Sequence, residues 1–324
     1  MKLSRRNLLH LAAAASIPSF RRPALAQAYP SRTVRIIVGQ SAGSGSDTGG
    51  RLLGQWLTER LGQPFIVENQ PGAAGNIASA SAVRAAADGH TLLMVSSANT
   101  VNASLYDKLS FNFIRDIAPI SGIFTVPLAM VVHPSFPAAT VPEFISYAKA
   151  NPGKINMASA GIGSTHHVTG ELFKFMTGVE MAHVPYSGSS PALNDLVSGQ
   201  TQVMFDVTST STALIKSGKL RPLAVTSTTR IDVLPDIPAM SDFLPGFEAS
   251  AWIGLGAPAG TPTAVIDMLN RAVNAGLAEP NIKARIAQLG GTPLLLSPVE
   301  LGKMIAVETE KWAKVIQSAN IKLK

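Results

Sequence analysis

The sequence contains no cysteine and no long apolar run, and each absence excludes a class of protein. Without cysteine the chain has no disulfide bonds and no thiolate metal sites. No apolar stretch approaches the roughly 18 to 20 residues that a membrane-spanning helix needs. The 324 residues, of which 46% are hydrophobic, are enough for one large domain or two of ordinary size.

The N-terminus has the pattern of an export signal. Ser4-Arg-Arg-Asn-Leu-Leu9 is a twin-arginine motif, an apolar stretch follows it, and small residues around Ala26 offer a cleavage site. An ordinary secretory signal is the alternative, and both predict a periplasmic protein. Five of the 27 basic residues and none of the 20 acidic residues lie in this segment, which leaves 22 against 20. The basic isoelectric point therefore does not indicate a nucleic-acid partner.

One stretch near the start of the mature chain has the build of an anion-binding site. Val34-Arg-Ile-Ile-Val38 is an apolar, β-branched run that predicts a buried strand. The glycines and serines of residues 39–46 allow a tight turn with free backbone N–H groups. Asp47 is a helix-capping residue, and the leucines after it recur at helical spacing. Free amides and the positive end of a helix dipole together favour a bound anion.

The same construction occurs a second time. Residues 154–157 predict a strand, residues 158–164 a Gly/Ser loop, and the segment that ends at Gly178 a helix. We therefore expect two similar α/β halves, each with a polar loop, and a ligand held between them. A shift of 116 positions supports this repeat, because it places Gly45 on Gly161, Gly62 on Gly178 and Gly72 on Gly188.

Three loops of the first half are expected to converge. Strands predicted at 34–38, 65–67 and 91–95 alternate with helical segments, which implies parallel pairing in a doubly wound sheet. Ligands bind beyond the carboxyl ends of strands in such sheets. The loops that should form one site are 39–47, 69–76 and 96–102.

Two apolar segments connect the halves. Residues 117–132 are expected to form a strand that leads into the second half, and residues 252–258 a strand that returns to the first. Two such crossings would make a hinge. The chain should end in three helices, at 262–278, 281–289 and 298–319. The predicted organisation is an export signal at 1–28, a first domain from 29–125 plus 248–324, and a second domain at 126–247.

The joint order of several motifs resembles one family, the Bug or TctC-like extracytoplasmic solute receptors of tripartite tricarboxylate transport systems. The resemblance covers essentially the whole chain. In one loop, Gly39-Gln40 stands where the family usually has Pro-Phe. The motifs are Tyr29-Pro-Ser-Arg, Gly43-Ser-Gly-Ser-Asp47, Val67-Glu-Asn-Gln-Pro-Gly-Ala-Ala-Gly-Asn76, Gly163-Ser-Thr-His-His167, Val184-Pro-Tyr-Ser-Gly188, Leu234-Pro-Asp-Ile-Pro238 and Ala257-Pro-Ala-Gly-Thr-Pro262.

The resemblance implies a two-domain periplasmic-binding-protein fold of the type II, Venus flytrap kind, in which each domain is a mostly parallel sheet flanked by helices. It implies capture of a di- or tricarboxylate, an acidic amino acid or an aromatic acid by backbone amides and waters, without metal, cofactor or catalysis. The implied partners are membrane permease subunits, and we expect a monomer. A sensor that presents its ligand to a signalling partner is an alternative. The implied ligand contacts are Ser41, Ala42, Ser44, Asp47, Ser97, Asn99, Ser164, Thr165, His167, Tyr186 and Asp206.

Several of these residues also have structural interpretations. Asp47 is expected to cap its helix whether or not it contacts the ligand, and Asp206 either orders site waters or caps a local turn. His167 and Glu171 share a helical face at a spacing that could hold a metal. A hydrogen-bonded pair is favoured instead, because no third ligand follows. Tyr186 would form a wall of the site, and its hydroxyl would need a partner if buried.

A serine hydrolase is the alternative from another class of protein. Gly39-Gln-Ser-Ala-Gly43 matches G-x-S-x-G between a strand and a helix, which would make Ser41 the nucleophile. Three features disfavour it. The motif follows the first mature strand, further glycines separate Ser41 from the helix, and no histidine follows His183.

Overall fold

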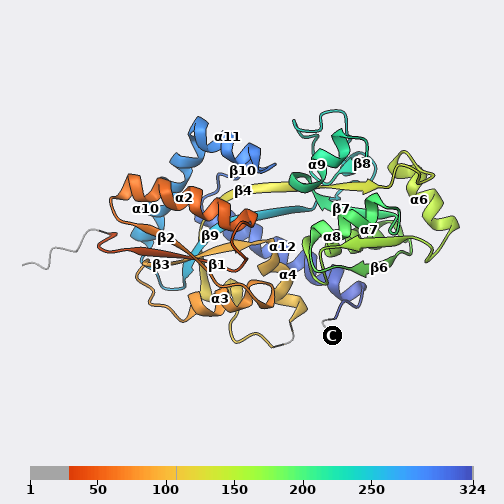
Figure 1. Ribbon diagram of the computed structural model, residues 1–324. Coiled ribbons are helices and arrows are strands. Elements are labelled where there is room, and N and C mark those ends of the chain that lie inside the picture. The colour runs from red at the N-terminus through yellow and green to blue at the C-terminus, as the bar shows by residue number, and fades with distance from the viewer. Residues whose placement is uncertain (1–28, 107, 323–324) are drawn as a thin grey trace, which may run out of the picture.

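The computed structural model describes residues 29–106 and 108–322, and the predicted export signal lies outside them. The molecule is elongated, with two α/β lobes side by side (Figure 1). One sheet runs through both lobes in the order β2-β1-β3-β9-β4-β7-β5-β6, and β8 and β10 also pair with β4. Within the described residues no helix has the length and apolar character to cross a membrane.

The first domain is built on three parallel strands with β1 in the middle. Its apolar run is buried on both faces, since Ile36 and Ile37 are almost fully inaccessible to solvent. Both neighbours of β1 are parallel to it, which confirms the predicted pairing. The strands are β1 (Val34–Val38), β2 (Phe65–Asn69) and β3 (Thr91–Ser96). The other elements are α2 (Gly45–Leu61), η1 (Ala73–Gly75), α3 (Asn76–Val83), α4 (Ser97–Leu105), α5 (Phe113–Asp116), α10 (Thr263–Ala278), α11 (Pro280–Gln288) and β10 (Thr292–Pro293).

The second domain repeats this plan around a core of aromatic rings that pack at an angle to one another. Phe173 lies 5.9 Å from Phe144 and 5.5 Å from Phe205 between ring centroids, and all three are fully buried. Burial of one such side chain stabilises a fold by about 1.5–3 kcal/mol. The strands are β5 (Asn156–Ser159), β6 (Ala182–Pro185), β7 (Val203–Val207) and β8 (Arg221–Val225). The helices are α6 (Val141–Ala150), α7 (Thr165–Thr177), α8 (Ser189–Val197), α9 (Thr208–Lys216) and η2 (Met240–Asp242).

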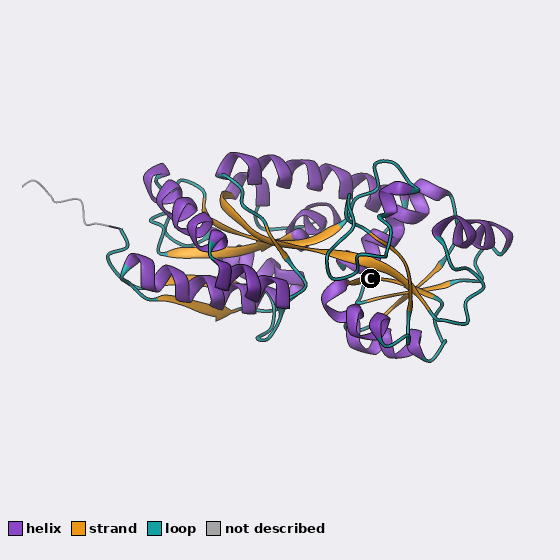
Figure 2. Cartoon of the chain, turned by 90° about the horizontal axis from the view of Figure 1, so that it is seen from above, coloured by secondary structure: helices purple, strands orange, loops and turns teal. Residues whose placement is uncertain are grey.

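Two strands and one helix join the domains. The strand β4 (Ile117–Val132), which has the predicted bounds, pairs antiparallel with β9 (Ser250–Pro258) and then with β7 and β8. Figure 2 shows long strands passing from one lobe to the other. The last helix, α12 (Pro298–Ser318), packs Leu301 into the first domain and Trp312 into the second. The exact domain bounds stay a prediction, because α12 serves both.

One predicted loop is a helix. Residues 96–102 were expected to be irregular, but α4 begins at Ser97. Ser96 and Asn99 form a capping box, which satisfies N–H groups at the helix start. Val101 and Leu105 then lie on one helical face and join the core of the second domain. The helix therefore forms because tertiary packing supports a short segment of weak helical propensity.

Candidate ligand-binding site

The side chain of Asp47 stabilises the first polar loop, residues 39–46. Ser44 caps α2 by accepting the Asp47 N–H at 3.2 Å, and the Asp47 Oδ2 accepts the Gly43 N–H at 2.8 Å. Gly43 has a φ of 82°, in the left-handed region that suits glycine. Arg51 lies 2.9 Å from the Asp47 Oδ1. Burial alone would raise the pKa of Asp47, but the hydrogen bonds from Arg51 and Gly43 lower it below its usual value.

The second polar loop has the same geometry with an imidazole in place of the carboxylate. Ser164 caps α7 by accepting the His167 N–H at 3.3 Å, and the His167 Nδ1 accepts the Gly163 N–H at 3.1 Å. Gly163 has a φ of 75°. The loop equivalence is therefore an offset of 120 residues, which corrects the offset of 116 inferred from glycines. The difference is one helical turn, because α2 has 17 residues and α7 has 13, and the offset of 116 applies at their C-caps, Gly62 and Gly178.

The third helix start lies where the domains meet. The Ser97 Oγ at the start of α4 is 3.4 Å from the Thr165 Oγ1 at the start of α7. A small cavity beside α4 is lined by Gln40, Ser46, Ala74 and Asn99, among others. This confirms that the three predicted loops of the first half converge. The cavity lining contains no charged side chain.

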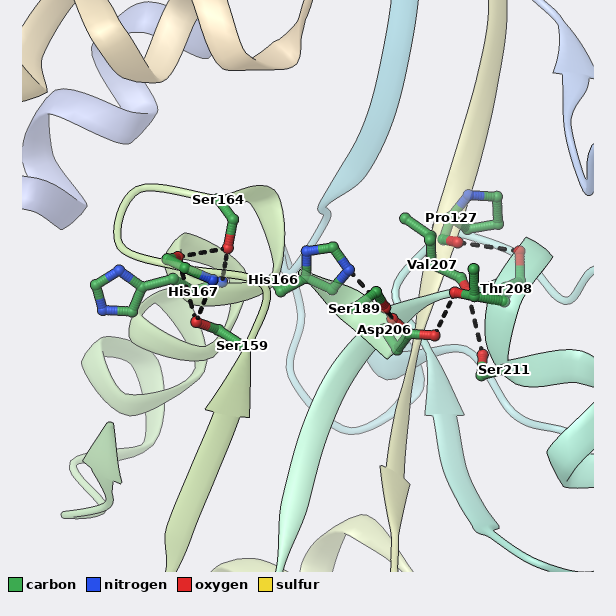
Figure 3. A network of polar contacts seen from close by, with 12 residues as sticks. Pro127, Ser159, Ser164, His166, His167, Ser189, Asp206, Val207, Thr208 and Ser211 are labelled. Carbon is green, nitrogen blue, oxygen red and sulfur yellow. Dashed lines mark hydrogen bonds and ion pairs between the residues drawn. The ribbon is translucent and has the colours of Figure 1, made fainter. Parts of the chain in front are cut away.

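Asp206 is fully buried and its carboxylate is occupied by protein groups (Figure 3). Its Oδ1 is 3.1 Å from the His166 Nε2 and accepts the Ser189 hydroxyl, and its Oδ2 accepts the Thr210 hydroxyl at 2.5 Å. The carboxylate thereby joins the starts of α7, α8 and α9 to the end of β7. Of the two roles considered for Asp206, ordering waters or capping a turn, this geometry fits a structural one. His166 was absent from the predicted contacts, and only its place at a helix start pointed to it.

His167 points away from His166, into the body of the second domain (Figure 3). Its ring stacks on His183, with centroids 3.6 Å apart and planes 7° from parallel. Its Nε2 is 3.6 Å from Glu171, which also binds Lys174 at 2.9 Å. Burial, followed by the charge of His167, lowers the pKa of His183 to about 4. His167 is 4% exposed, and its ring nitrogens face the Gly163 N–H and Glu171, so this geometry fits a residue that supports the loop.

The remaining predicted contact residues differ in whether their side chains are already hydrogen-bonded within one domain. The Asn99 side chain bonds the Ser96 N–H and the Ser79 hydroxyl. The Tyr186 hydroxyl donates to Asp195 at 2.6 Å, and burial together with this carboxylate raises the pKa of Tyr186 to about 12. Ser41 and Ala42 are exposed on the first loop, and Ser97 and Thr165 face each other across the domains.

The electrostatics of the site come from helix ends and not from basic side chains. The starts of α2, α4 and α7 carry backbone N–H groups with no partner inside the helix, and the helix dipoles place positive potential there. Such a site binds an anion through amides, hydroxyls and water. A larger cavity of about 720 Å³ lies between β4, β9 and α12, and it shares no residue with these loops. Among residues 29–106 and 108–322 no cluster of three or more His, Asp or Glu residues could hold a metal ion.

Comparison with known proteins identifies the fold and the family. The family model described as "Tripartite tricarboxylate transporter family receptor" matches residues 50–321. Protein BugT of Bordetella pertussis is 36% identical over 307 residues, which cover 93% of this chain and 94% of BugT.

Two solved structures contain a small dicarboxylate. Rpa4515 of R. palustris with adipate is 34% identical at a TM-score of 0.79 and covers 91% of this chain and 99% of its own. MatC of Rhodopseudomonas palustris with bound malate is 32% identical at a TM-score of 0.75, and the match covers 89% of this chain and 100% of MatC. The chain therefore belongs to the tripartite tricarboxylate transporter receptor family, the TctC or Bug family of periplasmic solute-binding proteins, which are not enzymes.

Proposed function

We propose that this receptor is exported by its twin-arginine signal, captures a small dicarboxylate between its domains, and delivers it to the permease subunits of a tripartite tricarboxylate transporter. The observation that carries the proposal is the contact of Ser97 with Thr165, which brings the starts of α4 and α7 together across the domains. The helix start of α2 lines the adjoining cavity through Ser46. Three positive helix ends beside a cavity whose lining has no charged side chain suit a carboxylate held by backbone amides.

Relatives narrow the ligand class. The two solved relatives contain adipate and malate, which are both dicarboxylates. A dicarboxylate can bring one charged end to α2 of the first domain and the other to α7 of the second. Contact with both domains gives the closed state interactions that the open state lacks, and this difference drives closure. The proposed contacts are the amides and hydroxyls of Ser41, Ala42, Ser44, Ser97, Ser164 and Thr165, with Gly39-Gln40 adjusting the choice of acid.

A thermal-unfolding panel tests this function. The mature protein is refolded free of carried-over ligand and heated with adipate, malate and related acids, each beside its diamide. A bound acid should stabilise the fold by about 2.7 kcal/mol at a hundredfold excess over its dissociation constant. The diamide should have no effect because it lacks the charge that the helix ends attract. Equal shifts in melting temperature for an acid and its diamide, or no shift with any acid, would contradict the proposal.

A further inference from the structure

Two imidazoles lie face to face directly beneath the second polar loop. His167 belongs to α7 and His183 to β6, and their ring centroids are 3.6 Å apart. The charged groups around the pair are Glu171 and Lys174 of the same helix. The hydroxyl of Ser159, from β5, is 2.6 Å from the His183 Nε2. His166 is turned toward Asp206 and takes no part in this cluster.

The hydrogen bonds of His167 require one particular protonation state. Its Nδ1 accepts the Gly163 N–H, so this nitrogen must carry a lone pair and no proton. The single ring proton then lies on Nε2, which faces Glu171. An imidazolium has no lone pair to offer. Protonation of His167 therefore breaks the bond that holds Gly163.

His183 supports the other end of the loop through Ser159. The Ser159 Oγ accepts the Gly161 N–H at 3.1 Å and donates to the Gly161 carbonyl at 3.2 Å. The same oxygen is the partner of the His183 Nε2. A proton on either stacked ring also places charge against the other ring at close range, which disfavours a second proton on the pair.

The first loop provides an internal comparison. There Asp47 accepts the Gly43 N–H at 2.8 Å in the same position that His167 takes in the second loop. Arg51 and Gly43 lower the pKa of this carboxylate, so it remains an acceptor in mild acid. Only the second loop depends on an imidazole acceptor, which loses its lone pair on protonation.

We propose that the stacked His167–His183 pair is a positioning device that holds the loop at residues 161–164 in its anion-binding conformation only while His167 is neutral, so that mild acid releases the ligand. The inference rests on the proposed function, since it assumes that this loop contacts the carboxylate. Neither histidine touches the ligand. Acid weakens ligand binding indirectly, because it displaces the backbone amides that the pair positions.

Two measurements test the pair independently of each other. In the ligand-free protein, NMR of ¹⁵N-labelled imidazoles should show an unprotonated Nδ1 on His167 at pH 7.5. The Gly163 amide should shift with the titration of the pair between pH 7.5 and 4.5. In the second measurement, calorimetry with adipate and malate gives affinities at the two pH values. The loss of one hydrogen bond corresponds to about a fivefold weaker affinity.

His167→Asn is the discriminating variant, because the amide oxygen can still accept the Gly163 N–H but does not titrate. The wild type should lose about fivefold more affinity than this variant between pH 7.5 and 4.5, and the acid's own protonation cancels in the comparison. If His167→Asn does not fold, the NMR titration of the wild type still tests the role of the pair. His133→Gln, at a partly exposed histidine bonded to Ser135, should follow the wild type.

Parallel pH profiles for wild type and His167→Asn would overturn the inference, as would tighter binding in acid. A Gly163 amide that does not respond to the titration would overturn it without any ligand. If neither acid binds at pH 7.5, the assigned dicarboxylate class fails, while the NMR titration still decides the role of the pair.

Discussion

Asp47 and His167 show how side chains can determine a ligand site that backbone atoms make. Each accepts a hydrogen bond from a glycine amide four residues earlier, and each lies behind its loop. An acceptor in this place selects a left-handed glycine and leaves the other amides of the turn free. Both residues were expected to contact the ligand, and the structure gives both a supporting position.

Replacement of Asp47 should separate its acceptor role from its charge. Asp47→Ala removes the acceptor of the Gly43 N–H and the charge partner of Arg51, and we expect a loss of about 1–3 kcal/mol in the free energy of unfolding. Asp47→Asn keeps an oxygen for Gly43 and should lose less. Urea unfolding at pH 7 measures both. Equal losses would show that the charge pair with Arg51, and not the bond to Gly43, is the stabilising contact.

At the scale of elements, α2 and α7 are two versions of one unit. Each begins after a glycine with positive φ and a serine N-cap, and each ends at a left-handed glycine. The units differ in their surroundings. A Cβ on Gly163 would lie 2.2 Å from the Leu105 Cδ2 of α4, whereas a Cβ on Gly43 would meet nothing within 4 Å. The second loop is packed against α4, and the first is open.

This difference predicts unequal effects for the same substitution. Gly43→Ala and Gly163→Ala share the strain of a left-handed non-glycine residue, about 1–2 kcal/mol. Gly163→Ala must also displace Leu105, and overpacking adds about 1–3 kcal/mol. We therefore expect Gly163→Ala to lower the melting temperature more. Equal melting temperatures would mean that α4 moves aside freely.

At the scale of the molecule, one sheet and one helix couple the domains while the ligand loops lie where they meet. The strand β4 pairs with β9 of the first domain and with β7 of the second. The helix α12 contributes to both cores. Relative motion of the domains must therefore bend these shared elements, and the Ser97–Thr165 contact reports their closure.

A disulfide between the domains tests this closure, and the chain has no cysteine of its own to interfere. Because the Ser97 and Thr165 hydroxyl oxygens are 3.4 Å apart, Ser97→Cys with Thr165→Cys should form a disulfide on oxidation. The oxidised protein should release a bound dicarboxylate more slowly than the reduced form. Each single-cysteine variant serves as the control. Failure to oxidise, or equal release rates, would contradict a closing contact at this place.

The sequence by itself determined the local build of this protein. Alternation of apolar runs with Gly/Ser loops predicted the strands at 34–38 and 117–132, the helix start after Ser164, and the convergence of three loops. It also predicted a helix start near Asp47, which the structure places at Gly45 because Ser44 is the N-cap. The order of its motifs predicted the family. These features follow from neighbours along the chain, because strand and helix periods, caps and turns act over a few residues.

Only the tertiary structure decided which polar side chains remain open. Asp206 is occupied by Ser189 and His166, and His167 stacks on His183 from a different strand. The segment at 97–105 became a helix because Leu105 packs into the other domain. Such contacts join residues that are distant in sequence, and the local residue pattern does not specify which distant residues will pack together. The sequence could therefore predict which polar residues lie near the site. Which of them support the loops and which remain free to face a ligand required the tertiary structure.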